Sequence, residues 1–222
     1  AYARSVTQLA SDLQQVRPTL LIAVPRVFER VYRRIQHQVA AKGGLSAWIF
    51  HTGVRVGWRR FQHHQGRAGW SPELLLWPLF RRLVAAKVAA RLGGRLRVAV
   101  SGGAPLSETV ARLFIGLDLN LLQGYGLTET SPVVSVNTPE NNDPRSVGVP
   151  LPGVDVSVGD DDELLVRGPG VMLGYWNNPE ATAATIDDRG WLHTGDQARL
   201  EGGRVYITGR IKDILVLSNG EK

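Results

Sequence analysis

Two short apolar segments in the middle of the chain, each followed by a glycine-containing loop, restrict the fold more than any other feature. Residues 95–100 alternate as a strand does and lead into Ser101-Gly102-Gly103-Ala104-Pro105. A helix is expected from about Ser107 to Ile115, and residues 119–123 predict a second strand that ends in the loop Gln123–Thr130. This order is typical of a parallel α/β sheet, where ligands bind beyond the carboxyl ends of the strands.

The residues before this region predict mainly helices. Residues 19–24 form an apolar run closed by a proline, which indicates a buried strand. Apolar residues at helical spacing predict a helix over 27–41 that ends at a glycine pair, and a second helix covers about 45–63. Ser71-Pro72 provides a cap followed by proline at the first helical position, so we expect a third helix from there to Leu92.

From about residue 145 the expected elements are short strands separated by glycine and proline turns, which predicts a small antiparallel, barrel-like sheet. One helix interrupts it, with Asn178 as the cap and Pro179 next. The expected strands are 154–158, 163–167, 191–194, 198–200 and 205–208.

The fold class is therefore α/β: a parallel sheet flanked by helices, followed by a small antiparallel part. We expect three parts, namely 1–140 with helices and the sheet, 141–208 with the β-rich region, and 209–222 as a connecting segment that contains a hinge and the start of a further domain.

Charge is distributed unevenly along the 222 residues, whose formal net charge is +6. Residues 1–100 contain 17 Lys and Arg against 3 Asp and Glu, whereas residues 101–222 contain 9 against 17. A basic half favours contact with anionic lipid, nucleic acid or a phosphorylated ligand, although scattered arginines are also typical of solvated helix faces. The lack of cysteine excludes disulfides, thiolate metal sites and a cysteine nucleophile.

The loop Gln123–Thr130 combines an aromatic ring, a hydroxyl and a carboxylate, a set that suits a nucleotide. Tyr125 can stack on a base, Thr128 can donate to a phosphate or carboxylate oxygen, and Glu129 can bind Mg²⁺. The flanking glycines would let the backbone approach a ligand and adopt positive φ. The sequence thus predicts an adenylate site at this loop.

Five segments resemble, in order and spacing, the motifs of the acyl-adenylate-forming enzymes, which include acyl-CoA synthetases, peptide-synthetase adenylation domains and luciferases. The five segments are 101–106, 123–130, 163–177, 190–196 and 209–213. The resemblance implies that Asp196 accepts hydrogen bonds from the ribose hydroxyls, that Arg210 binds ribose or the α-phosphate, and that Lys212 occupies a hinge. The full set of expected nucleotide-binding residues is Gly102, Gly103, Ala104, Pro105, Gln123, Gly124, Tyr125, Gly126, Thr128, Asp196 and Arg210; Thr128 and Glu129 are the expected catalytic pair, with Glu129 the metal ligand.

The same resemblance implies a two-step reaction with ATP, Mg²⁺ and CoA, in which an acyl-adenylate forms and a thiol then releases AMP. The family's phosphate loop and its C-terminal lysine match no segment of these 222 residues. We therefore expect the chain to be an internal part of the large N-terminal domain of a longer protein, and to be inactive by itself.

Two segments, Gly190–Asp196 and Val24–Arg30, resemble long-chain fatty acyl-CoA synthetases more than peptide-synthetase domains. We expect a cytoplasmic ligase of long-chain fatty acids, with peripheral contact at the inner face of the membrane. Two alternatives stay open: a fatty acyl-AMP ligase that loads a carrier protein, and a non-catalytic basic module that binds membrane or nucleic acid. Nucleic acid is the less favoured partner.

Overall fold

The computed structural model describes residues 4–5 and 8–212, and the chain divides into two compact units. Unit 1 comprises the residues up to Gln123 together with Thr138–Pro144, and unit 2 comprises Gly124–Asn137 together with the residues from Arg145 onward. We expected a boundary near residue 140. The contacts instead group Gly124–Asn137 with the β-rich unit, because this segment pairs with strands of that unit.

Unit 1 is built on a parallel sheet, as the order of its segments predicts. Strands β1 (Leu20–Ala23), β2 (Val98–Ser101) and the first part of β3 (Asn120–Gly126) run parallel with β2 in the centre. Ala99 and Leu121 lie opposite each other in neighbouring strands and are almost fully buried. In β1, however, Leu20 and Ile22 are 52% and 73% exposed, so the expectation of a buried strand over 19–24 is wrong for one of its faces.

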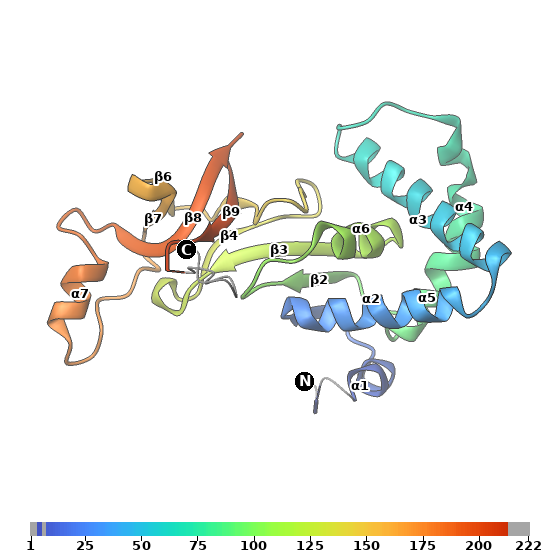
Figure 1. Ribbon diagram of the computed structural model, residues 1–222, viewed down its shortest axis with the longest axis horizontal. Coiled ribbons are helices and arrows are strands. Elements are labelled where there is room, and N and C mark those ends of the chain that lie inside the picture. The colour runs from blue at the N-terminus through green and yellow to red at the C-terminus, as the bar shows by residue number, and fades with distance from the viewer. Residues whose placement is uncertain (1–3, 6–7, 213–222) are drawn as a thin grey trace, which may run out of the picture. The chain divides into compact units, whose positions relative to one another are not determined.

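Helices pack around this sheet and supply most of the core of unit 1 (Figure 1). The phenyl rings of Phe28 and Phe114 meet edge to face at 5.8 Å and join two of these helices. The expected helices over 27–41, 45–63 and 107–115 are confirmed, whereas the sequence did not predict the first helix. The helices are α1 (Leu9–Val16), α2 (Pro25–Ala40), α3 (Gly44–His64) and α6 (Glu108–Gly116).

Helices α3 and α6 approach each other at two glycines. A Cβ atom on Gly57 would lie 2.0 Å from the carbonyl oxygen of Gly116, and a Cβ on Gly116 would lie 2.5 Å from the carbonyl oxygen of Val54. Neither helix could come this close with a larger residue at its crossing position, so the two glycines set the distance between α3 and α6.

The helical run expected from Ser71 to Leu92 is confirmed in extent, but it is not one regular α-helix, and the expected side-chain cap at Ser71 is wrong. A 3-10 turn over Pro72–Leu76, helix α4 (Trp77–Phe80), a π turn over Arg81–Ala85 and helix α5 (Ala86–Arg91) replace the single helix. Pro78 gives the physical reason: it lacks the N–H that would bond to the carbonyl of Leu74, and its ring would clash with that carbonyl.

Unit 2 contains two antiparallel sheets around a shared apolar core. In the first, Gly124–Gly126 of β3 pairs with β4 (Val133–Val136), which pairs with β5 (Val149–Pro150). The second has the order β6-β7-β8-β9. Its strands are β6 (Asp155–Val158), β7 (Glu163–Arg167), β8 (Leu192–Glu201) and β9 (Arg204–Arg210).

The second sheet matches most of the strand pattern read from the sequence. The two strands expected at 191–194 and 198–200 are one strand, β8, with an irregular register between Gln197 and Ala198. Helix α7 (Pro179–Thr185) begins as expected, because the side-chain oxygen of Asn178 accepts a hydrogen bond from the amide of Ala181 at 3.1 Å.

Candidate functional site

The loop that follows β3 is closed by its own side chains. Residues Thr128–Thr130 form a 3-10 turn, and the hydroxyl oxygen of Thr130 accepts a hydrogen bond from the amide of Leu127 at 3.0 Å. Thr130 is buried, whereas Thr128 is exposed and Glu129 is half-buried. The turn therefore presents the hydroxyl and the carboxylate outward from a fixed base.

The expectation that Gly124 and Gly126 use positive φ is wrong, since neither falls in the left-handed region. Gly126 is needed for a different reason: a Cβ atom there would lie 1.7 Å from the carbonyl oxygen of Pro132. The returning chain thus passes directly against the glycine. Close approach of backbone to backbone, and not unusual dihedral angles, accounts for this glycine.

Tyr125, Asp196 and Arg210 come together in unit 2 from three strands. The phenolic hydroxyl of Tyr125 donates to Asp196 Oδ2 at 2.6 Å, and Arg210 Nε lies 3.1 Å from Asp196 Oδ1. Asp196 and Arg210 are register partners on β8 and β9, which places their side chains on the same face. A carboxylate offers about four lone-pair sites, so two acceptor positions are left for ligand hydroxyls.

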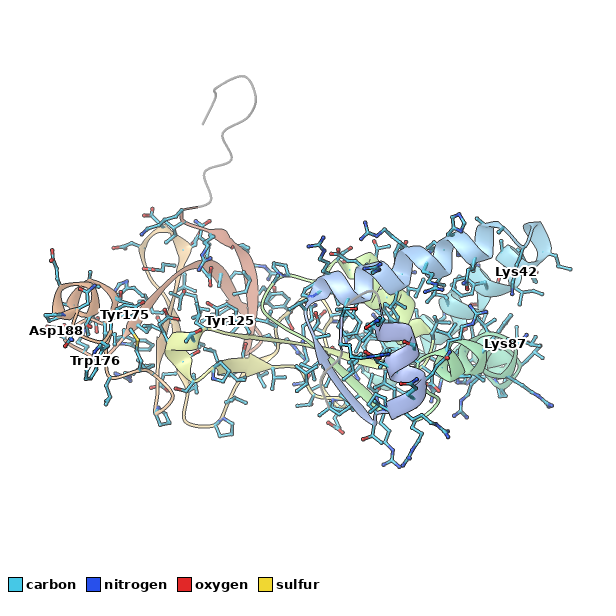
Figure 2. The ribbon with its side chains drawn as sticks, turned by 90° about the horizontal axis from the view of Figure 1, so that it is seen from below. Lys42, Lys87, Tyr125, Tyr175, Trp176 and Asp188 are labelled. Carbon is cyan, nitrogen blue, oxygen red and sulfur yellow. The ribbon has the colours of Figure 1, made fainter. Side chains whose placement is uncertain are left out.

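The environment of Tyr125 favours its protonated form. Burial of the phenol, followed by its hydrogen bond to the negative Asp196 carboxylate, raises the pKa of Tyr125 far above its usual value of 10.0. The hydroxyl therefore acts as a permanent donor to Asp196 at neutral pH. Figure 2 marks Tyr125 within unit 2.

Glu163 and His193 support the turn that carries Asp196, and the sequence did not assign either residue to the site. The carboxylate of Glu163 accepts a hydrogen bond from the amide of Gly195 at 2.8 Å and lies 2.7 Å from His193 Nδ1. Gly195 has φ +71°, a conformation that favours glycine. The hydroxyl of Thr194 donates to the carbonyl of Leu164 at 2.7 Å. The sequence signal for this support is that Glu163 opens the segment 163–177 and that His193 lies in the segment 190–196, both of which resemble family motifs.

Glu129, the expected metal ligand, is contacted by Tyr175 from the loop before α7. The Tyr175 hydroxyl donates to Glu129 Oε1 at 3.0 Å, and this hydrogen bond raises the pKa of Tyr175. Figure 2 shows Tyr175 and Trp176 together beside α7. The backbone carbonyl of Glu129 also accepts a hydrogen bond from the amide of Met172 at 2.8 Å. This loop therefore covers one side of the turn.

A Mg²⁺ site can be formed with only one carboxylate from the protein. Within residues 4–5 and 8–212, no cluster of three or more His, Cys, Asp or Glu could hold a metal alone. Mg²⁺ is commonly held by one or two carboxylates together with substrate phosphates. The half-buried Glu129, next to an open cavity, fits that pattern.

The cavity beside the turn has a volume of about 650 Å³ and is lined entirely by unit 2. Glu129, Tyr175, Gly195, Arg210 and Lys212 are among its walls. This volume falls within the range of about 300–1,000 Å³ that is usual for small-molecule sites. Lys212, the expected hinge residue, is exposed. Residues 213–222 of the expected connecting segment lie outside the described residues.

The remaining expected nucleotide-binding residues belong to unit 1. The loop Gly102–Pro105 follows β2 at its carboxyl end, and Gly103 has φ +83°. Gln123 is buried, and its side chain bonds to the backbone: Oε1 accepts from the amide of Leu106 at 3.1 Å, while Nε2 donates to the carbonyl of Pro144 at 2.5 Å. Gln123 thus fixes the end of that loop, and its expected contact with nucleotide stays a prediction.

Residues 2–176 match the protein family described as AMP-binding enzyme. The chain belongs to this family. It is 38% identical to the long-chain-fatty-acid–CoA ligase FadD15 of Mycobacterium tuberculosis, over 99% of this chain and 36% of that protein. It is 34% identical to the peroxisomal long chain acyl-CoA synthetase 6 of Arabidopsis thaliana, over 96% of this chain and 32% of that protein. The chain thus spans about a third of the length of these curated relatives.

A solved structure with related architecture is a malonyl-CoA ligase in a ternary product complex with methylmalonyl-CoA and AMP bound. The two chains are 26% identical with a TM-score of 0.57, over 93% of this chain and 36% of the other. The likeness agrees with the sequence-based fold class: a parallel-containing α/β sheet followed by an antiparallel part.

Proposed function

We propose that the protein is an AMP-forming ligase that joins a long-chain fatty acid to CoA through an acyl-adenylate. The observation that carries this proposal is the 38% identity to a long-chain-fatty-acid–CoA ligase across 99% of the chain. The acceptor cluster around Asp196 and the turn that presents Thr128 and Glu129 supply a chemically suitable site.

In this proposal the ribose hydroxyls donate to Asp196, whose carboxylate is oriented by Tyr125 and Arg210. The ring of Tyr125 stacks on adenine, while Arg210 keeps donors available for the α-phosphate or ribose. Gly124–Gly126 provide backbone that approaches the base, while Gly102–Pro105 and Gln123 stay nucleotide contacts predicted from the sequence. These residues position the nucleotide and change no covalent bond.

The first half-reaction forms a bond between a carboxylate oxygen of the fatty acid and the α-phosphorus of ATP, and breaks the bond to pyrophosphate. In the second, the thiol sulfur of CoA attacks the acyl carbon, loses its proton and displaces AMP. The hydroxyl of Thr128 donates to the negative oxygens, and Glu129 would hold Mg²⁺, which neutralises phosphate charge when bound. Positioning and charge stabilisation account for most of such catalysis.

We also propose that the protein acts on the cytoplasmic side of a membrane as a peripheral protein, because long-chain acids partition into bilayers. Within the part of the chain that the structure describes, no helix combines the length and apolarity needed to span a bilayer.

Calorimetric titration of AMP into this chain tests the nucleotide site, with Asp196→Ala and Asp155→Ala as a matched pair of carboxylate deletions. Asp155 is an exposed residue of unit 2 that pairs with Arg167. We expect Asp196→Ala to weaken AMP binding by about tenfold or more, the value of one charge-assisted hydrogen bond, and Asp155→Ala to leave it unchanged. Equal effects of the two changes would remove Asp196 from the site.

The full-length protein then tests the reaction with palmitate, ATP and either CoA or a phosphopantetheinylated carrier protein. Acyl-CoA and acyl-AMP are measured separately. Formation of palmitoyl-CoA with release of AMP is expected. Transfer of the acyl group from acyl-AMP to the carrier protein and not to CoA would instead assign the protein as a fatty acyl-AMP ligase.

A further inference from the structure

A second cavity, entirely within unit 1, lies between helices α1, α2, α3 and α5 and has a volume of about 620 Å³. None of the residues assigned to the nucleotide site belongs to it. Its inner wall is apolar and continues the core of unit 1. The apolar side chains of this wall include Val27, Val31, Ile35, Ile49, Val84 and Val88.

Basic side chains surround the opening of this groove. Arg30 and Arg34 come from α2, Lys42 follows α2, and Lys87 and Arg91 come from α5. All five are exposed. Figure 2 shows Lys42 and Lys87 toward the same end of unit 1. Two helices that are distant in sequence thus place positive charge around one opening.

The groove has no internal counter-charge. No Asp or Glu lines it, and none of the five cations forms an ion pair with another residue in the described ranges 4–5 and 8–212. Five cations with no acidic residue among them give this opening a positive potential, so the arrangement is complementary to a negatively charged partner.

The combination of charge and apolar wall restricts the type of anionic partner. A single-stranded nucleic acid would be expected to meet aromatic rings for stacking, and Phe50, the groove's aromatic side chain, is buried. A duplex would contact the cations through its phosphates and leave the apolar wall without a partner. An anionic bilayer presents phosphate groups beside acyl chains, and therefore offers both kinds of contact at once. Leu83 at the groove remains 40% exposed and can enter the acyl region.

We propose that this basic groove is the surface by which the protein docks on an anionic phospholipid bilayer. The inference rests on the peripheral membrane contact included in the proposed function, and assigns that contact to named residues. The five cations bind lipid phosphates, and Leu83 with the adjoining apolar wall contacts the outer part of the acyl chains.

Vesicle sedimentation tests the charges with two matched double variants of this chain. Lys87→Glu/Arg91→Glu reverses two groove cations one helical turn apart on α5. Arg55→Glu/Arg59→Glu makes the same change, with the same spacing, on exposed positions of α3 outside the groove. The vesicles are phosphatidylcholine alone or with 30% phosphatidylglycerol, at about 0.15 M salt, where charges beyond about 8 Å are screened.

Each basic residue near an anionic surface contributes roughly a fivefold factor in partitioning, so removal of two cations should cost about 25-fold and the charge-reversed groove variant should lose more than that. The α3 variant should stay within about threefold of the wild type because of screening. Leu83→Ser should lower binding to anionic vesicles by about three- to fivefold, the effect of burying its remaining exposed surface. Leu79 is 54% exposed and lies outside the groove, so Leu79→Ser should leave binding to anionic vesicles unchanged. Lys87→Gln/Arg91→Gln should be intermediate, and circular dichroism checks the fold of each variant.

Equal losses in the two charge-reversed variants would overturn the proposal, as would equal binding to neutral and anionic vesicles or no binding of the wild type. Binding of an acidic amphipathic peptide without binding of vesicles would assign the groove to a protein partner instead. AMP titration of the same samples separates the two proposals, since the groove variants retain every nucleotide-site residue. Loss of vesicle binding with intact AMP binding concerns the groove alone.

Discussion

Removing the phenolic hydroxyl of Tyr125 is the most direct test of how Asp196 is held. In Tyr125→Phe the ring and its apolar contacts stay, while the 2.6 Å hydrogen bond to Asp196 Oδ2 is lost. Arg210 still contacts the other carboxylate oxygen at 3.1 Å. The variant therefore isolates one interaction within the cluster.

The expected cost follows from the charge and burial of the acceptor. Asp196 has a side chain only 13% exposed, so water replaces the lost donor incompletely. A hydrogen bond to a charged group contributes about 1.5–3 kcal/mol to the free energy of unfolding. With a urea slope of about 1.5 kcal/mol per molar, the unfolding midpoint of unit 2 should fall by about 1–2 M.

Fluorine NMR of the 5-fluorotryptophan-labelled chain measures this change in unit 2 separately. Trp176 and Trp191 report on unit 2, whereas the other four tryptophans lie in unit 1. A double-mutant cycle with Asp196→Ala then isolates the pairwise term, which should equal most of the single-variant loss. A coupling energy below about 0.5 kcal/mol, within the usual additivity of independent sites, would refute the argument that Tyr125 holds Asp196.

Three further predictions concern pH, packing and the support of the site. Because the pKa of Tyr125 is raised in the folded chain, the stabilisation by this phenol is present below pH 10 and is lost at higher pH. Above pH 10 the free energy of unfolding of unit 2 should therefore fall by about 1.4 kcal/mol per pH unit more in the wild type than in Tyr125→Phe, as measured by urea unfolding between pH 9.5 and 11. Gly57→Ala should destabilise unit 1 by about 3 kcal/mol through overpacking against α6, whereas Gly69→Ala, which has open space around it, should change the unfolding midpoint little. Glu163→Ala should weaken AMP binding about tenfold by releasing the amide of Gly195, the loss expected for a hydrogen bond to a charged acceptor. Glu180→Ala, an exposed change on α7, should leave AMP affinity unaltered, and equal affinities for both variants would contradict a supporting role.

Local signals in the sequence predicted much of the fold. The strand at 163–167 and the cap at Asn178 agree with the structure because alternation and capping depend on neighbours in the chain. Strand β4 was missed, since its pairing with Gly124–Gly126 is a tertiary property. The change of helix type around Pro78 could have been expected from the proline alone.

The site shows the same division between residue type and long-range contact. The carboxylate of Asp196 and the hydroxyl of Tyr125 were read separately, as a ribose acceptor and a stacking ring. Their hydrogen bond joins residues 71 positions apart, and the bond from Gly195 to Glu163 spans 32. The helical and strand periodicities of the sequence do not predict contacts between residues so far apart in the chain. Residue chemistry therefore indicated the site, while the contacts that orient it came from the structure.

The closure of the Thr128–Thr130 turn by Thr130 has a consequence for the thermodynamics of ligand binding. Fixing a backbone residue costs about 1–2 kcal/mol in conformational entropy, and here that cost is met during folding. A nucleotide that meets an ordered turn loses less affinity to loop ordering, and its association rate need not wait for the loop to close. The hydrogen bonds of one buried threonine thereby make this corner of the site ready before any ligand arrives.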